Sequence, residues 1–119
     1  MMKILIVDDS TVNNILLENL FESHGYDCYS VLESDSVIDT INTYKPDIIL
    51  LDIMMPGLTG FDILKLMNKH SIKIPTIILT AYKNSDYKKQ AKELGAVEYF
   101  SKPFDQEELL KTIKEVTSK

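Results

Sequence analysis

Three short runs of consecutive apolar residues, at positions 4–7, 48–51 and 77–79, are the strongest pattern along the chain. Each run is apolar at every position and ends at polar residues. Continuous rather than alternating hydrophobicity is typical of strands that are covered on both faces, as in a parallel sheet. Weaker patterns predict two more strands, over residues 26–32 and 96–100.

Segments with helical spacing separate these strands. The first aligns four apolar residues on one face, namely Val12, Ile15, Leu16 and Leu20, and ends at Gly25. The side chains expected to cap the five helices are Ser10, Ser34, Thr59, Asn84 or Ser85, and Asp105, the last with Glu108 in a variant of the capping box. Alternating strands and helices with short connections predict an α/β fold, in which helices cover both faces of one doubly wound, five-stranded parallel sheet. We expect a single domain over residues 1–119.

Composition and charge exclude several classes of function and location. The chain has 119 residues and a net charge of -5, and all 13 basic residues are lysines. A negative chain without a basic stripe repels nucleic acid, so we expect no direct binding to it. The apolar runs are too short to cross a membrane or to form a signal peptide. The single cysteine, Cys28, excludes a disulfide framework and fits a small buried side chain in a reducing compartment, so we expect a cytoplasmic location.

Polar residues follow the predicted strands at their carboxyl ends, which is where ligands bind in this class of fold. Asp8 and Asp9 follow the first strand, Asp52 the third, Thr80 the fourth and Lys102 the fifth. Two carboxylates about 4 to 5 Å apart repel by roughly 3 to 4 kcal/mol at an effective dielectric constant near 20. One lysine neutralises only part of this charge, so we expect a divalent cation, and all-oxygen ligands favour Mg²⁺ or Mn²⁺. A cation, a carboxylate, a hydroxyl and a lysine together are the components of phosphoryl transfer.

These residues stand in a specific order, with ILIVDDS at 4–10, LLDIMMPG at 50–57, LTA at 79–81 and KPF at 102–104. In this order the chain resembles the receiver domains of two-component response regulators over essentially its whole length. The resemblance implies a flavodoxin-like fold with strand order 2-1-3-4-5. It also implies that the chain is not a turnover enzyme but a phosphoacceptor, which catalyses its own phosphorylation and dephosphorylation.

The resemblance further implies roles for the acidic residues. A sensor histidine kinase or a phosphotransfer protein would phosphorylate Asp52. Asp9, Asp52 and the backbone carbonyl of Met54 would hold Mg²⁺ directly, and Asp8 would help through water.

The remaining roles implied by the resemblance concern the response to phosphorylation. Thr80 and Lys102 would each bind a phosphoryl oxygen, and the ring of Tyr99 would turn inward when Thr80 moves toward the phosphoryl group. The peptide bond before Pro103 would be cis. The surface of the fourth helix, fifth strand and fifth helix would then control a downstream output protein or a C-terminal domain outside this chain, and a phosphorylation-dependent homodimer is a further partner to expect.

Other functions share parts of this residue set. A phosphohydrolase like those of the haloacid-dehalogenase family also forms an aspartyl phosphate, but its nucleophile follows the first strand and its acidic pair comes late, whereas here the pair comes first and Asp52 follows. An unphosphorylated interaction module is disfavoured by the intact acidic set. A flavin-binding protein is disfavoured because no glycine-rich or hydroxyl-rich phosphate loop follows the first strand. The chain fits a stand-alone regulator or the N-terminal part of a longer one.

Overall fold

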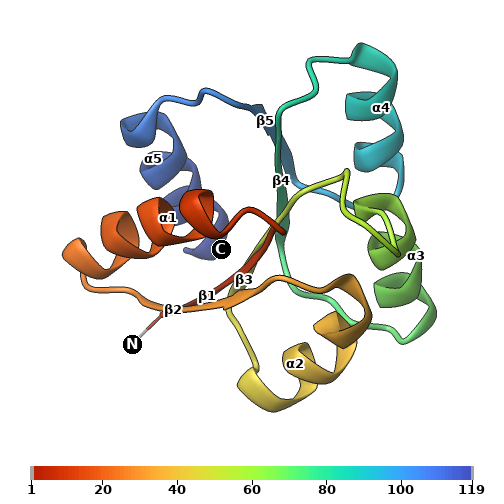
Figure 1. The fold of residues 1–119 in the computed structure, drawn as a ribbon, viewed down its shortest axis with the longest axis horizontal. Coiled ribbons are helices and arrows are strands. Elements are labelled where there is room, and N and C mark those ends of the chain that lie inside the picture. The colour runs from red at the N-terminus through yellow and green to blue at the C-terminus, as the bar shows by residue number, and fades with distance from the viewer. Residues whose placement is uncertain (1, 119) are drawn as a thin grey trace.

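A five-stranded parallel sheet forms the centre of the protein in the computed structural model, which describes residues 2–118 (Figure 1). Its strand order is β2-β1-β3-β4-β5, as predicted. The strands are β1 (Lys3–Val7), β2 (Asp27–Val31), β3 (Ile48–Leu51), β4 (Thr76–Thr80) and β5 (Glu98–Ser101). The sheet therefore has β2 and β5 as its two edge strands.

Five helices cover both faces of the sheet. The helices are α1 (Thr11–Ser23), α2 (Val37–Tyr44), α3 (Gly60–Lys69), α4 (Ser85–Glu93) and α5 (Gln106–Thr117). Figure 1 shows α1 and α5 on one face and α2, α3 and α4 on the other. Within residues 2–118, none of these helices combines the length and the apolarity that crossing a membrane requires.

The core has two layers, one on each face of the sheet, and the central strands belong to both. In β1, Leu5 and Val7 pack with the layer under α2, α3 and α4, whereas Ile4 and Ile6 pack with the layer under α1 and α5. This explains the continuous apolar runs, because successive side chains of a strand point to opposite faces and both faces are buried here. Cys28 on the edge strand β2 is only half-buried, which corrects the expectation of a buried side chain, and burial raises its pKa to about 12.

Three of the four apolar residues predicted to face the sheet from the first helix lie on the surface, whereas the fourth, Leu20, is half-buried and packs against the core. Val12 is 71% exposed, Ile15 50% and Leu16 63%, and the residues of α1 that lie against the sheet are instead Leu17 and Phe21, at 2% and 0% exposure. Hydrogen bonds near its N-terminus orient the helix in this way, because Asn14 is buried and its side-chain amide donates to the Asp8 carbonyl. The most apolar stripe of α1 is consequently a surface.

Four of the five helix caps predicted from the sequence are formed in the structure. Ser10, Thr59, Asn84 and Asp105 each accept hydrogen bonds from backbone N–H groups of the first turn. The expected capping box at Asp105 is only half formed in the described residues, whereas Thr59 forms a complete one with Asp62. Ser34 is not a cap, since it begins a short 3₁₀ turn before α2 and its hydroxyl bonds elsewhere.

Candidate functional site

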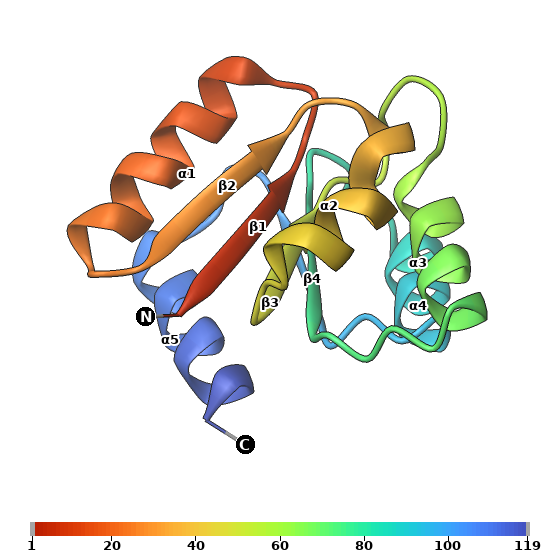
Figure 2. The ribbon, with the colours of Figure 1, turned by 90° about the horizontal axis from the view of Figure 1, so that it is seen from below.

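The polar residues that follow the strands converge at the carboxyl end of the sheet. Because β1, β3, β4 and β5 are successive neighbours, the residues after them are brought into one crevice. Figure 2 shows the loops that follow β1 and β3 at the same end of the sheet. One carboxylate oxygen from each of Asp8, Asp9 and Asp52 lies within 4.8 Å of the others. Asp8 and Asp52 are buried, and Asp9 is exposed.

Lys102 lies between the two buried carboxylates. Its Nζ is 2.7 Å from Asp8 Oδ2 and 3.8 Å from Asp52 Oδ2. Asp8 also accepts hydrogen bonds from the Ser10 backbone N–H and from Asn13 Nδ2, both at 2.9 Å. The Asp8 carboxylate is thus held in place by three contacts, whereas Asp52 has one ion pair within residues 2–118, the longer of the two.

Two buried oxygens of this crevice lack hydrogen-bond partners among the described residues. They are Asp52 Oδ1 and Thr80 Oγ1, and Thr80 is fully buried. A buried polar atom without a partner costs roughly 1 to 3 kcal/mol, so a ligand that supplies the missing contact is favoured. Burial and, after it, the Asp8 carboxylate raise the pKa of Asp52. The Thr80 hydroxyl, which lies near this carboxylate but outside hydrogen-bond geometry, and the Lys102 ammonium group oppose this rise only in part. An all-oxygen set with excess negative charge fits a hard divalent cation such as Mg²⁺.

The loop after β3 holds Asp52 against the first turn of α3. The Gly60 N–H donates to the Ile53 carbonyl at 2.7 Å. A Cβ at Gly60 would lie 2.5 Å from the Asp52 carbonyl oxygen and 2.9 Å from Ile53 Cα, so the approach requires glycine. Met54, which follows, is 42% exposed, so its side chain packs little.

Ser34 connects this loop to the loop after β2. Its hydroxyl donates to the Pro56 carbonyl at 3.1 Å and accepts the Leu58 N–H at 2.9 Å. Sequence reasoning missed this role, and it also missed the contacts of Asn13 and Asn14 with Asp8. The only sequence signal for the asparagines is their position one turn after the acidic pair.

Tyr99 and Pro103 lie beside the crevice on β5 and the loop that follows it. The Tyr99 hydroxyl donates to the Tyr82 carbonyl at 2.7 Å, which holds the ring toward α4. The Lys102–Pro103 peptide bond is cis. Tyr99 lies half-buried.

Comparisons with known proteins agree with this geometry. A family model described as "Response regulator receiver domain" matches residues 4–114. Sporulation initiation phosphotransferase F of Bacillus subtilis (strain 168) is 40% identical over 112 residues, which cover 94% of this chain and 90% of that protein. Protein PilH of Pseudomonas aeruginosa is 38% identical over 118 residues, which cover 98% of each chain. Among solved structures, the receiver domain of Francisella response regulator 1452 matches with a TM-score of 0.93 at 30% identity, covering 99% of this chain and 98% of that one.

The matched region contains β1 from its second residue, the other four strands, and the carboxylate cluster of Asp8, Asp9 and Asp52. The strand order is also the one that the resemblance implied. Members of the matched family are typically phosphoacceptors rather than turnover enzymes. The chain therefore belongs to the response regulator receiver domains of two-component systems.

Proposed function

We propose that Asp52 accepts a phosphoryl group from the phosphohistidine of a sensor kinase or phosphotransfer protein. The observation that carries this proposal is the buried Asp52 Oδ1, which has no hydrogen-bond partner among residues 2–118. In the reaction, a carboxylate oxygen of Asp52 forms a bond to phosphorus while the phosphorus–nitrogen bond to the donor imidazole breaks. The electron pair of that bond stays on the imidazole nitrogen.

The carboxylates of Asp9 and Asp52 and the Met54 carbonyl would hold Mg²⁺ directly, and Asp8 would help through water. Mn²⁺ has the same ligand preference. The bound cation would neutralise negative charge on the phosphoryl oxygens. Asp8 is already oriented for this role by its bonds to the Ser10 N–H and the Asn13 amide.

Thr80 and Lys102 would bind the phosphoryl oxygens, which would give the unpaired Thr80 hydroxyl its missing partner. Hydrogen bonds to charged groups contribute about 1.5 to 3 kcal/mol each, so the two together supply roughly 3 to 6 kcal/mol. Inverting a population from 1:99 to 99:1 needs about 5.5 kcal/mol. We therefore expect phosphorylation to shift Tyr99 and the surface of α4, β5 and α5 only partly until an output partner binds.

The donor would contact the exposed apolar face at the start of α1. This face, formed by Val12, Ile15 and Leu16, begins at the same turn whose Asn13 binds Asp8. A cavity of about 230 Å³ continues from Leu16 to Lys102 and Phe104. Because this cavity joins Leu16 to Lys102 of the crevice, a donor that contacts this face would have its phosphohistidine near Asp52.

Intact-mass measurement after incubation with acetyl phosphate and Mg²⁺ tests the proposal. We expect the parent protein to gain the mass of one phosphoryl group and Asp52→Asn to gain none. Asp39→Asn, an exposed aspartate on α2, is the matched control and should label like the parent. An Asp52→Asn protein that labels as well as the parent would overturn the assignment, and multiple turnover of a phosphomonoester would favour a phosphohydrolase instead.

A further inference from the structure

The loop after β3, residues 52–59, joins the carboxylate cluster to the first turn of α3. Asp52 stands at its beginning, and Met54, whose carbonyl is a proposed ligand of Mg²⁺, follows two residues later. The side chains of Ile53 and Met55 are buried, at 0% and 7% exposure, so they fix the first part of the loop on the core. The position of the Met54 carbonyl therefore depends on what holds the rest of the loop.

Ser34 holds the middle of this loop from the neighbouring loop after β2 (Figure 2). Its hydroxyl donates to the Pro56 carbonyl at 3.1 Å and accepts the Leu58 N–H at 2.9 Å. The side chain is 6% exposed, and both functions of its hydroxyl are used. Among residues 2–118, no other side chain from outside the loop forms a hydrogen bond with residues 54–58. Ser34 is thus the polar support of this part of the loop.

The backbone of the loop approaches Ser34 closely. Gly57 lies between the two bonded residues with a φ of 85°, which favours glycine, and a Cβ there would lie 2.9 Å from Ser34 Oγ. At the far end of the loop, the Gly60 N–H donates to the Ile53 carbonyl at 2.7 Å. The loop is therefore closed on itself at Gly60 and tied to the loop after β2 at Ser34.

Ser34 is itself anchored by a folded element. It is the first residue of the 3₁₀ turn Ser34–Ser36, which leads directly into α2. Val37 and Ile41 of that helix are buried in the core, at 0% and 3% exposure. The hydroxyl of Ser34 thus links the loop after β3 to a helix that is packed on the sheet.

A cavity of about 510 Å³ borders both this bridge and the carboxylate cluster. It is lined by Ser34, by Pro56, Gly57 and Leu58 of the loop, and by Asp9, the exposed carboxylate of the cluster. The bridge therefore lies beside the cluster, where a shift of the loop would reach the carboxylates.

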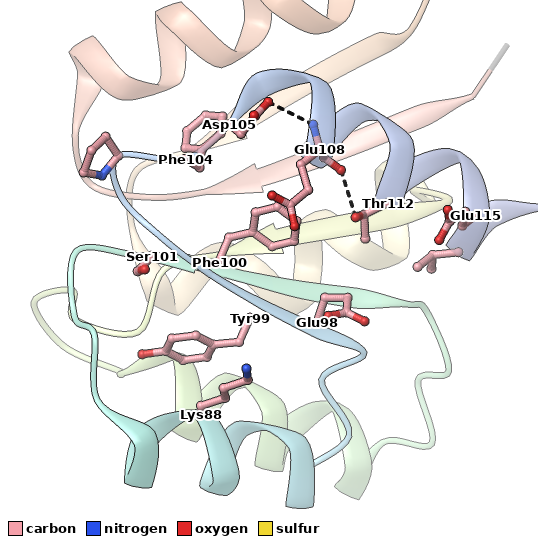
Figure 3. A pocket seen from close by; sticks show the side chains of 12 residues that line it. Lys88, Glu98, Tyr99, Phe100, Ser101, Phe104, Asp105, Glu108, Thr112 and Glu115 are labelled. Atoms are coloured by element: carbon pink, nitrogen blue, oxygen red, sulfur yellow. Dashed lines mark hydrogen bonds between the residues drawn. The ribbon is translucent and has the colours of Figure 1, made fainter.

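The opposite edge of the sheet gives the loop no comparable support. Figure 3 shows a cavity of about 560 Å³ across β5, whose walls come from α4 and α5. The hydrogen bonds drawn there join the Glu108 N–H to Asp105 and the Thr112 hydroxyl to the Glu108 carbonyl, so they stay within α5 and its cap. Within residues 2–118, none of the residues that line this cavity belongs to the loop after β3. The polar support of the loop thus comes from the β2 side.

We propose that Ser34 is a positioning residue of the Mg²⁺ site, which holds the loop after β3 so that the Met54 carbonyl stays in place to bind the cation. The inference rests on the proposed function, because it takes Asp9, Asp52 and the Met54 carbonyl as the direct ligands. Removing a group that orients a metal ligand commonly lowers metal affinity about 10-fold to 100-fold. Ser34 acts through the loop backbone rather than on the ligand itself, so the loss should be smaller.

Mn²⁺ binding followed by electron paramagnetic resonance tests the inference on the full chain without any phosphoryl donor. We expect Ser34→Ala to raise the dissociation constant for Mn²⁺ about 3-fold to 10-fold. Tyr44→Phe is the matched control, because it removes the hydrogen bond from the Tyr44 hydroxyl to Asp27, at the start of β2 and away from the crevice. This control should bind Mn²⁺ like the parent. Equal affinity in Ser34→Ala and the parent, or an equal loss in both variants, would overturn the inference.

The rate of labelling by acetyl phosphate at increasing Mg²⁺ concentration provides a second test. Ser34→Ala should need about 3-fold to 10-fold more Mg²⁺ to reach half of its maximal rate. At saturating Mg²⁺ it should label as fast as the parent, because Asp52, Thr80 and Lys102 are unchanged. A lower maximal rate with an unchanged Mg²⁺ requirement would show that Ser34 does not act through the cation site.

Failure of this inference and failure of the proposed function give different results. A parent protein that binds no Mn²⁺, or an Asp52→Asn variant that labels like the parent, would contradict the proposed function. A parent that binds Mn²⁺ and is labelled at Asp52, together with a Ser34→Ala variant of the same Mn²⁺ affinity, would contradict the inference about Ser34 alone.

Discussion

Replacing Asp52 with asparagine should stabilise the folded protein in the absence of divalent cations. The reason is that Asp52 is a buried carboxylate beside two others, with oxygens within 4.8 Å of one another. Asparagine keeps the shape of the side chain but removes its charge. A site organised for function is expected to cost stability when its ligand is absent.

The magnitude follows from the distances. At 4.8 Å and an effective dielectric constant near 20, each neighbouring carboxylate repels Asp52 by about 3.5 kcal/mol, and Asp9 less because it is exposed. Lys102 Nζ, 3.8 Å away, attracts it by about 4.4 kcal/mol on the same basis. Asparagine loses all three interactions and also avoids the desolvation of a buried charge. We expect the free energy of unfolding to rise by about 1 to 3 kcal/mol.

Urea unfolding at neutral pH in a metal-free buffer measures this difference, with Asp39→Asn as the control for removing an exposed charge. Adding Mg²⁺ should stabilise the parent by mass action, by about 2.7 kcal/mol at a concentration of 100 times the dissociation constant. The Asp52→Asn variant has lost one ligand and should gain less. The stability difference between the two proteins should therefore shrink as Mg²⁺ is added.

The same reasoning fixes the pH dependence. The pKa of Asp52 is raised in the folded protein, first by burial and then by the Asp8 carboxylate. Between the unfolded and the folded pKa the native state binds more protons, so the free energy of unfolding of the parent should fall as pH rises through this window. Asp52→Asn should lack this decline. A variant that is less stable than the parent in metal-free buffer, or a parent whose stability rises with pH relative to the variant, would refute the reasoning.

Three further predictions concern the surroundings of the site. Ser34→Ala leaves the Leu58 N–H without its partner, so it should lower the free energy of unfolding measured in urea by about 1 to 3 kcal/mol. The Leu58 amide hydrogen should also exchange faster. Unchanged exchange at Leu58 would contradict the bridging role. Gly60→Ala places a Cβ against the backbone of Asp52, so it should lower the free energy of unfolding by more than about 1 kcal/mol. It should also slow labelling by acetyl phosphate. A variant that unfolds and labels like the parent would contradict the close approach. The Leu16 side chain is 63% exposed and available to a donor protein, so Leu16→Ser should slow phosphoryl transfer from a phosphorylated donor protein about 10-fold. Labelling by acetyl phosphate, which needs no such contact, should be unchanged. A variant that accepts phosphoryl groups from the donor protein as fast as the parent does would argue against donor contact at Leu16.

Much of the fold follows from the sequence because its central strands are buried on both faces. Ile48 to Leu51 are all buried, and the predicted strand over residues 48–51 has the bounds that the structure shows. The edge strands have weaker patterns because they are less covered, and the prediction for the last strand, over 96–100, begins two residues before Glu98. Burial on both faces therefore decides how sharply a strand can be located.

The orientation of α1 could not be predicted from its apolar residues. A stripe of valine, isoleucine and leucine normally marks the buried face of a helix. Here the polar Asn14 is buried instead, and Phe21 fills the space against the sheet. The amide nitrogen of Asn14 donates to the Asp8 carbonyl, while its Oδ1 has no partner among the described residues. Only a tertiary hydrogen bond makes a buried asparagine acceptable, and such a partner is not visible from helical spacing.

The candidate site, like the fold, could be predicted from the sequence only in part. The residue types at strand ends predict that Asp8, Asp9 and Asp52 meet, because parallel neighbouring strands end at one edge. The same reasoning brings Lys102 to these carboxylates, where it pairs with Asp8. The hydroxyl bridge of Ser34 to the loop after β3 depends instead on loop conformations that bring together residues far apart in the chain. That bridge has no local signature, so only the structure reveals it.

Locating the phosphoryl group is the most direct test of the account. After labelling with acetyl phosphate and Mg²⁺, borohydride converts an aspartyl phosphate to homoserine, and peptide mass spectrometry identifies the converted position. The account predicts homoserine at position 52 and nowhere else. Conversion at Asp8, at Asp9 or at an aspartate outside the crevice, with Asp52 intact, would contradict it.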